Sequence, residues 1–590
     1  MIDKVGWTVL AAGAAAIPLI TSNTYYLYVA ISVGLLTIVT AGLNVLVGFT
    51  GQTSLGHAGL YAFGAYTAAL CVTRAGMGEW AAIAAAIAVT SVVGAAVAAA
   101  ALRVSGPYLA MVTIAFGLIV EGVLIEWGSV TGGPGGIFNI PKPALRTHYW
   151  TVMLAAALAL WLTANLRRSA WGRALLAVKS SEVAAESLGL SSYYVRIAAF
   201  TVSAAFAGAA GALFTFLNGY ISPDSFTLQT SILFLLALLF GGLGRIAGPV
   251  AGSLALTIMP ELLTSLLDYR LILYGTLLLV SIYWLPEGVI GKLSRGRRPR
   301  TAPHPSSPRL AASVSARTAA LSTEGREERE GATGAEAALL IAEGVSLSFG
   351  GVTALADANV AVAGGSIHAI IGPNGAGKTT LVNVLSGYFA PDSGRLALRG
   401  RRIDGLAPYA IARLGIARTF QTAQVFGGLS ARENVAVGVA GPRLGPVLGA
   451  LAGTPGARAR ESAIQARAQA LLEGLGLGDA AEKPAEALAA GLRRRLEIAR
   501  ALATDPLLLM LDEPAAGLAP AEIAALDEQL TGLRDQGGPA VILVEHHMDL
   551  VMAVSDRITV LDYGRVIADG TPEAVRGDPA VIEAYLGSAS

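Results

Sequence analysis

The stretch from Gly372 to Thr380 carries residue types at a spacing that suits phosphate chemistry. Its letters, GPNGAGKTT, match the pattern G-x-x-x-x-G-K-[ST] of a phosphate-binding loop. A mostly apolar run, Ile367 to Ile371, precedes the pattern, and a helix-like run, Thr380 to Leu385, follows it. Glycines let backbone N–H groups turn inward and surround phosphate oxygens. The sequence therefore predicts a nucleotide site in a loop between a strand and a helix.

Two side chains of this loop have expected roles in binding ATP and Mg²⁺. Lys378 would reach the β- and γ-phosphates, and the Thr379 hydroxyl would hold Mg²⁺. The other loop residues expected to contact ATP are Gly372, Asn374, Gly375, Gly377 and Thr380.

A pair of carboxylates further along the chain supports the same chemistry. The apolar run Leu507 to Leu511 predicts a buried strand that is followed by Asp512 and Glu513, which fits the Walker B pattern. Asp512 would position Mg²⁺ through water, and Glu513 would polarise the attacking water as general base. The alternative, a strand that merely ends in surface acids, is disfavoured by the phosphate-binding loop upstream.

The composition of the chain shows what must position these residues. With 590 residues, the chain is too long for a single core, so at least two domains are expected. Charged residues make up only 14% and hydrophobic residues 54%, and charges are sparse before Gly291 but frequent after it. The net charge of +1 indicates no nucleic-acid partner. The single cysteine, Cys71, excludes an internal disulfide and a multi-cysteine metal site.

The first half is expected to be a bundle of membrane-spanning helices. A helix needs ~20 apolar residues to cross a bilayer, and several runs here approach that length. Some runs are short or merge, so eight to ten helices are predicted. The candidate spans are Trp7–Ile20, Tyr26–Phe49, Leu60–Thr73, Trp80–Leu102, Tyr108–Trp127, Trp150–Leu166, Val195–Leu217, Thr227–Phe240, Val250–Leu263 and Leu271–Leu285. The first is interpreted as a membrane helix and not as a cleaved leader, because many spans follow it.

Basic residues near helix ends predict the orientation of the bundle. One cluster, from Arg167 to Lys179, lies in a single loop, and a second, from Lys292 to Arg300, follows the last span. Both loops are therefore expected in the cytoplasm, which suits a nucleotide-binding domain after the second cluster. The basic start of the second loop could also contact anionic lipid headgroups.

The first basic loop continues into a short predicted helix. Ser180 or Ser181 would be its N-cap, and Gly189 would follow its C-terminus. The stretch resembles the EAA-like coupling segment of ABC importer permeases, in which such a helix docks in a groove of the ATPase and transmits its motion. The alternative is an ordinary amphipathic loop helix. The residues expected to carry coupling are Glu182, Ala185, Glu186 and Gly189.

Several stretches of the first half resemble the permease family for branched-chain amino acids. They are LNVLVGFTGQTSLGH from Leu43, GPYLAMVT from Gly106, TGGPGGI from Thr131, ISPDSF from Ile221, GGLG from Gly241 and LPEG from Leu285. The resemblance covers nearly all of residues 25–290. Glycines and prolines at membrane depth predict broken helices or re-entrant turns, which must be buried in protein or line a cavity. His57 lies in the first of these stretches and could contact substrate or be hydrogen-bonded within a turn.

Residues 291–337 are interpreted as a flexible linker. The stretch is basic, then rich in Pro, Ser and Ala, then charged, and it has no apolar period. The expected domains are therefore a membrane domain over 1–290, the linker, and an α/β nucleotide-binding domain over 338–590.

The second half resembles ABC ATPases, in detail those of branched-chain amino acid importers. The resemblance implies that Phe349 stacks on adenine, that Gln421 contacts Mg²⁺ and water and senses the permease, and that His546 bonds the γ-phosphate. Gln421, Glu513 and His546 are thus the expected catalytic residues. Thr379, Gln421 and Asp512 are the expected Mg²⁺ residues.

One motif departs from the family pattern. The ABC signature LSGGQ aligns with Leu488, Ala489, Ala490, Gly491 and Leu492, so the serine hydroxyl and glutamine amide are gone. Gly491 and a following helix remain, so a backbone N–H at a helix N-terminus can still meet a γ-phosphate. In ABC dimers each signature faces the other subunit's phosphate-binding loop, so the defect would weaken the partner's ATP site.

Together, the resemblances imply an inner-membrane permease fused to its ATPase subunit, importing branched-chain or related hydrophobic amino acids at the expense of ATP. They also imply a second permease, a second ATPase and an extracytoplasmic solute-binding protein as partners. Related systems carry urea, short amides or aromatic acids, and these solutes stay open. An ABC exporter is disfavoured by the many short apolar runs and the EAA-like loop. A regulatory ATPase without substrate is a further alternative, which substrate uptake dependent on Lys378 and Glu513 would exclude.

Overall fold

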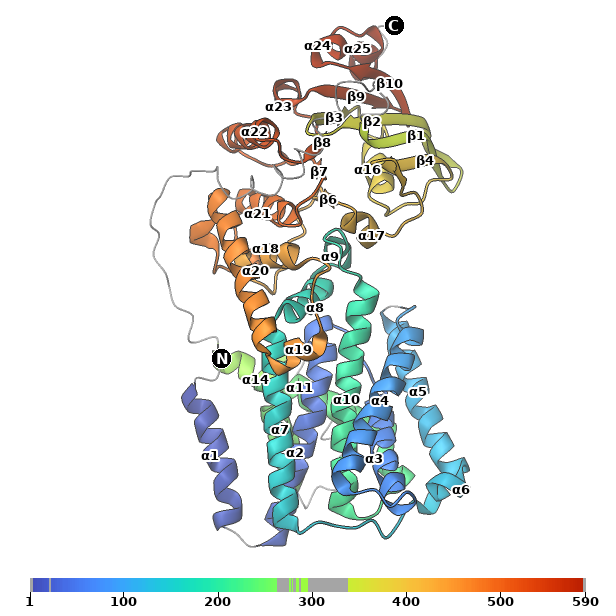
Figure 1. Cartoon of the computed structure of the whole chain (residues 1–590), viewed down its shortest axis with the longest axis vertical. Coiled ribbons are helices and arrows are strands. Elements are labelled where there is room, and N and C mark those ends of the chain that lie inside the picture. The colour runs from blue at the N-terminus through green and yellow to red at the C-terminus, as the bar shows by residue number, and fades with distance from the viewer. Residues whose placement is uncertain are drawn as a thin grey trace. The chain divides into compact units, whose positions relative to one another are not determined.

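The computed structural model of the chain describes residues 4–20, 23–104, 106–262, 275–276, 279, 283–285, 288–294 and 338–586. Its contacts divide them into two compact units, which are described separately (Figure 1). Most of the predicted linker, and most of the span predicted at Leu271–Leu285, lie outside the described residues. The division into 1–290, 291–337 and 338–590 stays a prediction.

The first half is helical throughout its described residues. Apolar runs rich in Leu, Ala, Val and Ile form these helices because every backbone polar group is then satisfied within its own segment. The elements are α1 (Lys4–Ile20), α2 (Thr24–Leu43), the π-helix η1 (Asn44–Gly48), α3 (His57–Thr73), α4 (Glu79–Ala101), α5 (Pro107–Glu126), α6 (Gly128–Thr131), η2 (Gly133–Gly135), α7 (Leu145–Arg168), α8 (Ala170–Ser180), α9 (Glu182–Glu186), α10 (Ser192–Asn218), η3 (Pro223–Phe226), α11 (Leu228–Gly241), α12 (Gly248–Leu262) and α14 (Gly288–Ser294).

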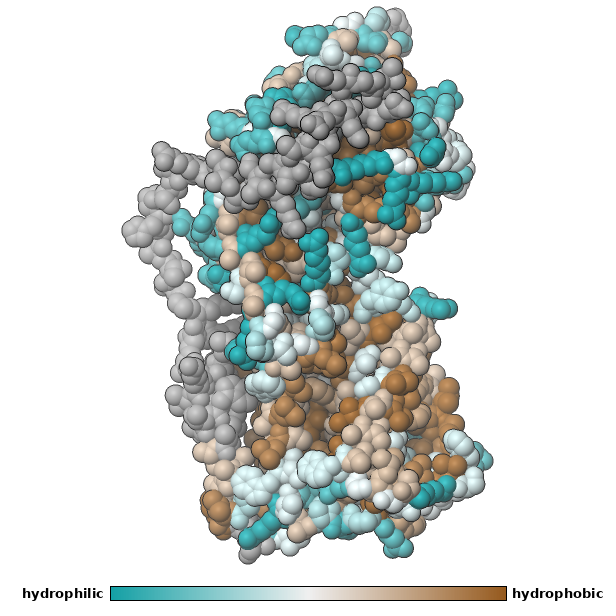
Figure 2. Space-filling model, viewed as in Figure 1, coloured by the Kyte–Doolittle hydropathy of each residue, from teal (hydrophilic) through white to brown (hydrophobic). Residues whose placement is uncertain are grey.

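Six helical segments among the described residues are long and apolar enough to cross a membrane. α1 and α3, with 17 residues each, and α12, with 15, are shorter. The polytopic helical class is confirmed, whereas the number of eight to ten helices stays a prediction. Figure 2 shows hydrophobic side chains on the visible face of these helices. Among the exposed apolar side chains of this half, Trp80 and Leu154 are more than two-thirds exposed. Such a large outward apolar surface suits lipid and not water.

The predicted helix interruptions are present, and their backbone groups are satisfied by side chains. The chain leaves the helical conformation between η1 and α3, and again between α11 and α12. Asn44 links the two regions, because its Nδ2 donates to Arg245 O at 3.0 Å and its Oδ1 accepts from Gly244 N at 2.8 Å. A side chain thus replaces the water that the bilayer cannot supply.

His57 is also hydrogen-bonded inside the helical bundle. It is fully buried, and its ring nitrogens are hydrogen-bonded to Ser54 Oγ at 2.8 Å and Ser203 Oγ at 2.7 Å. Because both nitrogens are engaged, the structure favours the second of the two expectations, a hydrogen bond within the turn, over contact with substrate.

The second half is an α/β domain with two sheets. Its elements are β1 (Ala338–Phe349), β2 (Val352–Ala363), β3 (Ile367–Ile371), α16 (Lys378–Leu385), β4 (Ser393–Leu398), β5 (Arg401–Arg402), α17 (Pro408–Arg413), β6 (Ile416–Arg418), α18 (Ala431–Ala440), α19 (Val447–Ala452), α20 (Pro455–Gly474), η6 (Gly478–Ala480), η7 (Ala485–Ala487), α21 (Ala490–Leu502), β7 (Leu508–Asp512), α22 (Pro520–Asp535), β8 (Ala540–Val544), α23 (Met548–Val554), β9 (Arg557–Asp562), β10 (Arg565–Gly570), α24 (Pro572–Arg576) and α25 (Pro579–Leu586).

The larger sheet positions the nucleotide motifs. Its order is β10-β9-β3-β8-β7-β6, and all pairs are parallel except β10 with β9. β3, β7 and β8 are buried along their whole length, as expected for parallel strands covered on both faces. The smaller sheet, β2-β1-β4-β5, is antiparallel. The carboxyl ends of parallel strands meet at one edge, so the loops after β3, β7 and β8 are neighbours.

Two segments fold with the other half's unit. Leu176–Ser192, which includes α9, is grouped with the second half, and Pro446–Pro455, which includes α19, is grouped with the first. Within the first unit α19 packs on α7, and Asn165 Nδ2 donates to Leu451 O at 3.0 Å. The domains expected from the sequence were contiguous, so this exchange of segments was not predicted.

A buried histidine in the central sheet predicts acid sensitivity. His368 Nε2 is hydrogen-bonded to Thr559 Oγ1 at 2.7 Å, and burial lowers the pKa of His368 to about 4, a fall that Asp569 opposes and Arg557 adds to. In the unfolded chain the pKa is about 6.5. The neutral histidine therefore contributes full stability above pH 6.5. About 1.4 kcal/mol is lost per pH unit between pH 6.5 and 4, roughly 3 kcal/mol in total.

We expect the His368→Gln variant to lose less stability than the natural chain between pH 7.5 and 5. The measurement is the temperature at which proteolysis of the second half begins in the detergent-solubilised chain. His547→Gln, which changes an exposed histidine of the same half, is the control and should behave like the natural chain. An equal acid shift in all three proteins would contradict the assignment.

Candidate functional site: a nucleotide pocket and its supporting network

The phosphate-binding loop joins β3 to α16 and holds Lys378 at the helix start. Gly377 has a φ of +100°, and a Cβ there would lie 2.6 Å from Ala354 O, so only glycine fits. Lys378 Nζ donates to Gly372 O at 2.7 Å and Pro373 O at 2.9 Å. The side chain is thus folded over the loop. Of the remaining predicted contacts, Asn374, Gly375 and Thr379 are exposed, while Thr380 is half-buried.

The electrostatics around Lys378 come from the end of β7. Burial lowers the pKa of the Lys378 ammonium, and the carboxylates of Glu513 and Asp512 oppose this fall. Lys378, Asp512 and Glu513 therefore interact electrostatically. The two carboxylates stabilise the charged form of Lys378 at the place where anionic phosphates would bind.

Asp512 is buried and paired. Its Oδ2 accepts from Arg418 Nη2 at 3.1 Å, and the side chains are 2% and 4% exposed. Burial raises the pKa of the Asp512 carboxyl, and the Arg418 guanidinium opposes that rise.

The arrangement fits the Mg²⁺ ion that the motifs imply. Asp512 Oδ1 is buried and has no hydrogen-bond partner among the described residues, which suits an oxygen reserved for a hard cation or its water. The described residues contain no group of three or more His, Cys, Asp or Glu side chains that could hold a metal. This is compatible with Mg²⁺, which binds through one or two carboxylates plus substrate phosphates.

Glu513 and Gln421 meet at the same edge. Gln421 Nε2 donates to Glu513 Oε2 at 3.0 Å. The backbone of Glu513 has a φ of +47°, and its N–H donates to Val544 O at 2.8 Å. A non-glycine residue in this region is strained, and such strain clusters at functional sites. The carboxylate is thus held by its backbone and oriented by the glutamine.

Two of the predicted residues are not joined to this cluster. The Phe349 ring is 46% exposed and meets Phe389 edge-on, with 5.1 Å between ring centroids. The His546 side chain is 57% exposed, and its closest recorded neighbours are Glu545 and His547. Both side chains are accessible to a ligand, and their roles stay predictions.

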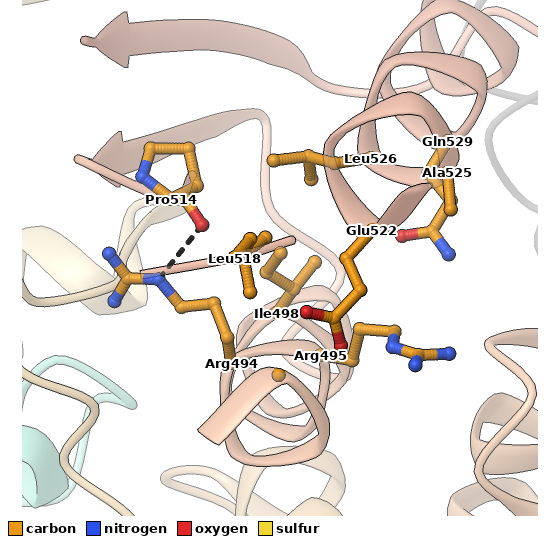
Figure 3. A pocket seen from close by; sticks show the side chains of 10 residues that line it. Arg494, Arg495, Ile498, Pro514, Leu518, Glu522, Ala525, Leu526 and Gln529 are labelled. Carbon is orange, nitrogen blue, oxygen red and sulfur yellow. Dashed lines mark hydrogen bonds between the residues drawn. The ribbon is translucent and has the colours of Figure 1, made fainter. Parts of the chain in front are cut away.

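The signature region begins α21 without a side-chain cap. Ala489 is the N-cap residue and makes no capping hydrogen bond, where a serine would satisfy an N–H of the first turn. A Cβ on Gly491 would lie 2.1 Å from Glu522 Oε1, so the end of the Glu522 side chain would have to move aside. Leu488, just before the helix, is buried. A small cleft lies between α21 and α22, with Gly491, Leu518 and Glu522 among its lining residues (Figure 3).

The comparisons decide the family. Residues of the second half are 43% identical, over 251 positions, to the high-affinity branched-chain amino acid transport ATP-binding protein LivG of Escherichia coli strain K12. The match covers 98% of that protein and 42% of this chain. The chain belongs to the branched-chain amino acid ABC transporters. BraF of Pseudomonas aeruginosa, described in the same words, is equally similar, with 43% identity over 251 residues, 98% of its length and 42% of this chain.

Both halves of the ABC transporter are present in this one polypeptide. The family described as branched-chain amino acid transport system / permease component matches residues 25–282, and the ABC transporter family matches residues 355–516. The family described as branched-chain amino acid ATP-binding cassette transporter matches residues 565–590. The permease protein LivM of E. coli K12 is 34% identical over 280 residues, which is 66% of its length and 42% of this chain. The chain is therefore a multi-pass inner-membrane protein with a cytoplasmic ATP-binding half.

The α9 segment of this transporter packs on the ATP-binding half within the second unit. Ser181 is the N-cap of α9, and its Oγ accepts from Ala184 N at 3.2 Å. Tyr388 Oη donates to Val183 O at 2.7 Å, and Arg413 Nε donates to Gly189 O at 2.9 Å. Of the predicted coupling residues, Ala185 is fully buried, Gly189 adopts a positive φ, and Glu182 and Glu186 lie at the ends of the helix.

A buried charged network on α21 of the ABC domain was not predicted from the sequence. Arg494 donates to Phe420 O, to the carbonyls of Asp512 and Glu513, and to Pro514 O at 3.3 Å, the bond drawn in Figure 3. Further along the helix, Glu497 Oε1 accepts from Phe420 N at 3.2 Å. The spacing of Arg494, Glu497 and Arg500 was the available signal, because residues three apart share a helix face.

Glu545 is a second residue that sequence analysis passed over. Its carboxylate is buried, and Oε1 accepts from Ala515 N at 2.6 Å, while Oε2 accepts from His546 N at 3.1 Å. One side chain thereby joins the loop after Glu513 to the loop that carries His546.

We expect Glu545→Gln to slow ATP hydrolysis more than it weakens ATP binding. Glutamine has only one acceptor oxygen, so of the N–H groups of Ala515, His546 and His547 that donate to Glu545, those at the replaced oxygen lose their partner. A hydrogen bond to a charged group is worth about 1.5–3 kcal/mol, which corresponds to roughly a ten- to hundredfold fall in kcat if the loops loosen. The measurement is kcat and the Kd for ATP in the assembled transporter. Glu473→Gln, at the surface of α20, is the control, and an unchanged kcat for Glu545→Gln would contradict the expectation.

Proposed function

We propose that this chain imports branched-chain or related hydrophobic amino acids across the inner membrane, with ATP as the energy source. One chain supplies one permease half and one ATP-binding half. The complete importer then needs a second permease, a second ABC ATPase and an extracytoplasmic solute-binding protein. The similarity of the two halves to LivG and to LivM supports this substrate class.

The geometry around the phosphate-binding loop supports the ATP site of this proposal. In this proposal, ATP displaces Lys378 from the carbonyls of Gly372 and Pro373, and the ammonium then contacts the β- and γ-phosphates. Phe349 offers its exposed ring to adenine. Thr379, Gln421 and Asp512 would hold Mg²⁺, which neutralises charge on the phosphates when it is bound.

Hydrolysis depends on the carboxylate of Glu513. It would accept a proton from the attacking water, and the bond from Gln421 fixes its direction. His546, on the exposed loop after β8, would bond the γ-phosphate once the two ATP-binding domains close.

Coupling to the permease is carried by α9, and its contacts are the observation on which the proposal rests. Tyr388, which contacts Val183 of α9, follows the helix that begins with Lys378, and Arg413, which contacts Gly189 just after α9, ends α17. Closure of the ATP-binding domains would thus move α9, and α9 would change the access of the membrane bundle.

The transport proposal makes a direct prediction for two variants. Lys378→Ala should lose ATP binding and uptake together. Glu513→Gln should keep ATP binding, while hydrolysis and uptake fall by about 10²–10⁴-fold, because a general base contributes that much. The measurement is uptake of radiolabelled leucine and ATP hydrolysis by the assembled complex in proteoliposomes. Uptake that persists in both variants would rule out an ATP-driven importer.

We further propose that the altered signature makes the two ATP sites unequal when the ATPase partner is a different protein. The lost serine and glutamine each remove a hydrogen bond worth roughly 0.5–1.5 kcal/mol, and up to ~3 kcal/mol to a charged group. The weakened site is the one whose phosphate-binding loop belongs to the partner. Glu513→Gln should therefore reduce hydrolysis more than the matching change in the partner's Walker B glutamate. Equal losses from the two changes would contradict unequal sites.

A further inference from the structure

Arg418 lies between the Mg²⁺ carboxylate and the helix that follows the phosphate-binding loop. Besides its ion pair with Asp512, its Nη1 donates to Asn383 Oδ1 at 2.6 Å and to Ser386 Oγ at 2.9 Å. Asn383 belongs to α16, and Ser386 is the residue directly after it. One buried guanidinium therefore joins the end of β7 to the end of α16.

Tyr388 joins that same place to the coupling segment. The Arg418 guanidinium carbon lies 5.6 Å from the centroid of the Tyr388 ring, within cation–π range. The Tyr388 backbone N–H donates to Asn383 O at 2.8 Å, and its hydroxyl donates to Val183 O of α9 at 2.7 Å. Burial raises the pKa of Tyr388, so the hydroxyl keeps its proton and remains a donor.

We propose that Arg418 and Tyr388 are positioning residues that form a relay from the Mg²⁺ carboxylate to α9. The relay rests on the proposed function of this transporter and adds a route beside the Gln421 loop, whose Phe420 contacts both Arg418 and Tyr388. If Asp512 holds Mg²⁺ through water, the charge that faces Arg418 would change. Arg418 contacts both the Tyr388 ring and the end of α16. A shift of Arg418 would therefore also move the Tyr388 hydroxyl that binds Val183 O of α9.

The chemistry of the two residues favours a relay over simple packing. A buried Arg–Asp pair costs desolvation that a hydrophobic pair of similar volume would avoid, so stability alone gives little reason for it. The Tyr388 hydroxyl reaches a backbone carbonyl of another segment, whereas phenylalanine would serve equally well for packing against Arg418 and Phe420.

Tyr388→Phe tests the last link, because it removes the hydroxyl and keeps the ring beside Arg418. We expect unchanged ATP affinity and basal hydrolysis, while leucine uptake per ATP hydrolysed falls about two- to tenfold, the value of one hydrogen bond. Tyr409→Phe is the matched control, since Arg413 lies 5.2 Å from that ring in the same way. Uptake per ATP that is the same in all three proteins would overturn the relay.

A second readout does not depend on the identity of the solute. Hydrogen exchange of residues 182–190 is compared with and without Mg-ATP in the Glu513→Gln background, which holds ATP bound. We expect Mg-ATP to alter the protection of this segment, and Tyr388→Phe to abolish the change while Tyr409→Phe preserves it. An identical response with Tyr388→Phe would overturn the relay, even if the solute is not leucine. Absent leucine uptake in the natural complex would instead count against the proposed substrate.

Arg418→Lys completes a double-mutant cycle. Lysine keeps the charge beside Asp512 but lacks the planar group that faces the Tyr388 ring. If the two residues form one relay, Tyr388→Phe should have little further effect on uptake per ATP in the Arg418→Lys background. Losses that multiply independently would show separate roles and would overturn the relay. Should Arg418→Lys fail to fold, the exchange experiment with Tyr388→Phe decides alone.

Discussion

The buried ion pair between Arg418 and Asp512 is the interaction on which the nucleotide half depends. Each partner alone would be a charge without solvent, so neither can be removed without leaving the other uncompensated. The pair fixes the end of β7, and Arg418 also fixes the end of α16 through Asn383 and Ser386. The end of β7 and the end of α16 are thereby held to each other.

The remaining loops are held by charges that act on backbone atoms. Arg494 contacts carbonyls on both sides of Glu513, and Glu545 collects N–H groups from the loops that follow β7 and β8. Side-chain charges can satisfy irregular backbone where no strand or helix partner is present. The strained backbone of Glu513 persists because these contacts over-determine it.

The features that sequence predicted are those with a local signal. Glycines at fixed spacing located the phosphate-binding loop, and an apolar run ending in acids located β7 and Asp512. Ser181 and Gly189 bounded α9 because capping depends on near neighbours. Arg418 and Glu545 had no such signal, because the sequence alone does not distinguish a buried, paired charge from a solvated one. For Arg494 only the three-residue spacing to Glu497 and Arg500 was available.

The membrane half shows the same limit. Gly and Pro interruptions predicted broken helices, yet the bond from Asn44 to the distant residues 244 and 245 depends on tertiary structure. Likewise, hydropathy cannot assign α19 to the first unit, because the residues of α19 lie within the sequence of the ABC domain.

The exchanged segments bear on how such transporters can be recombined. A permease half donates α9 to the second unit, and an ATP-binding half donates α19 to the first. A graft of a foreign cassette onto this membrane domain must therefore satisfy two separate fits, one around Val183 and one around Asn165. Because both halves lie in one polypeptide, the two fits are inherited together.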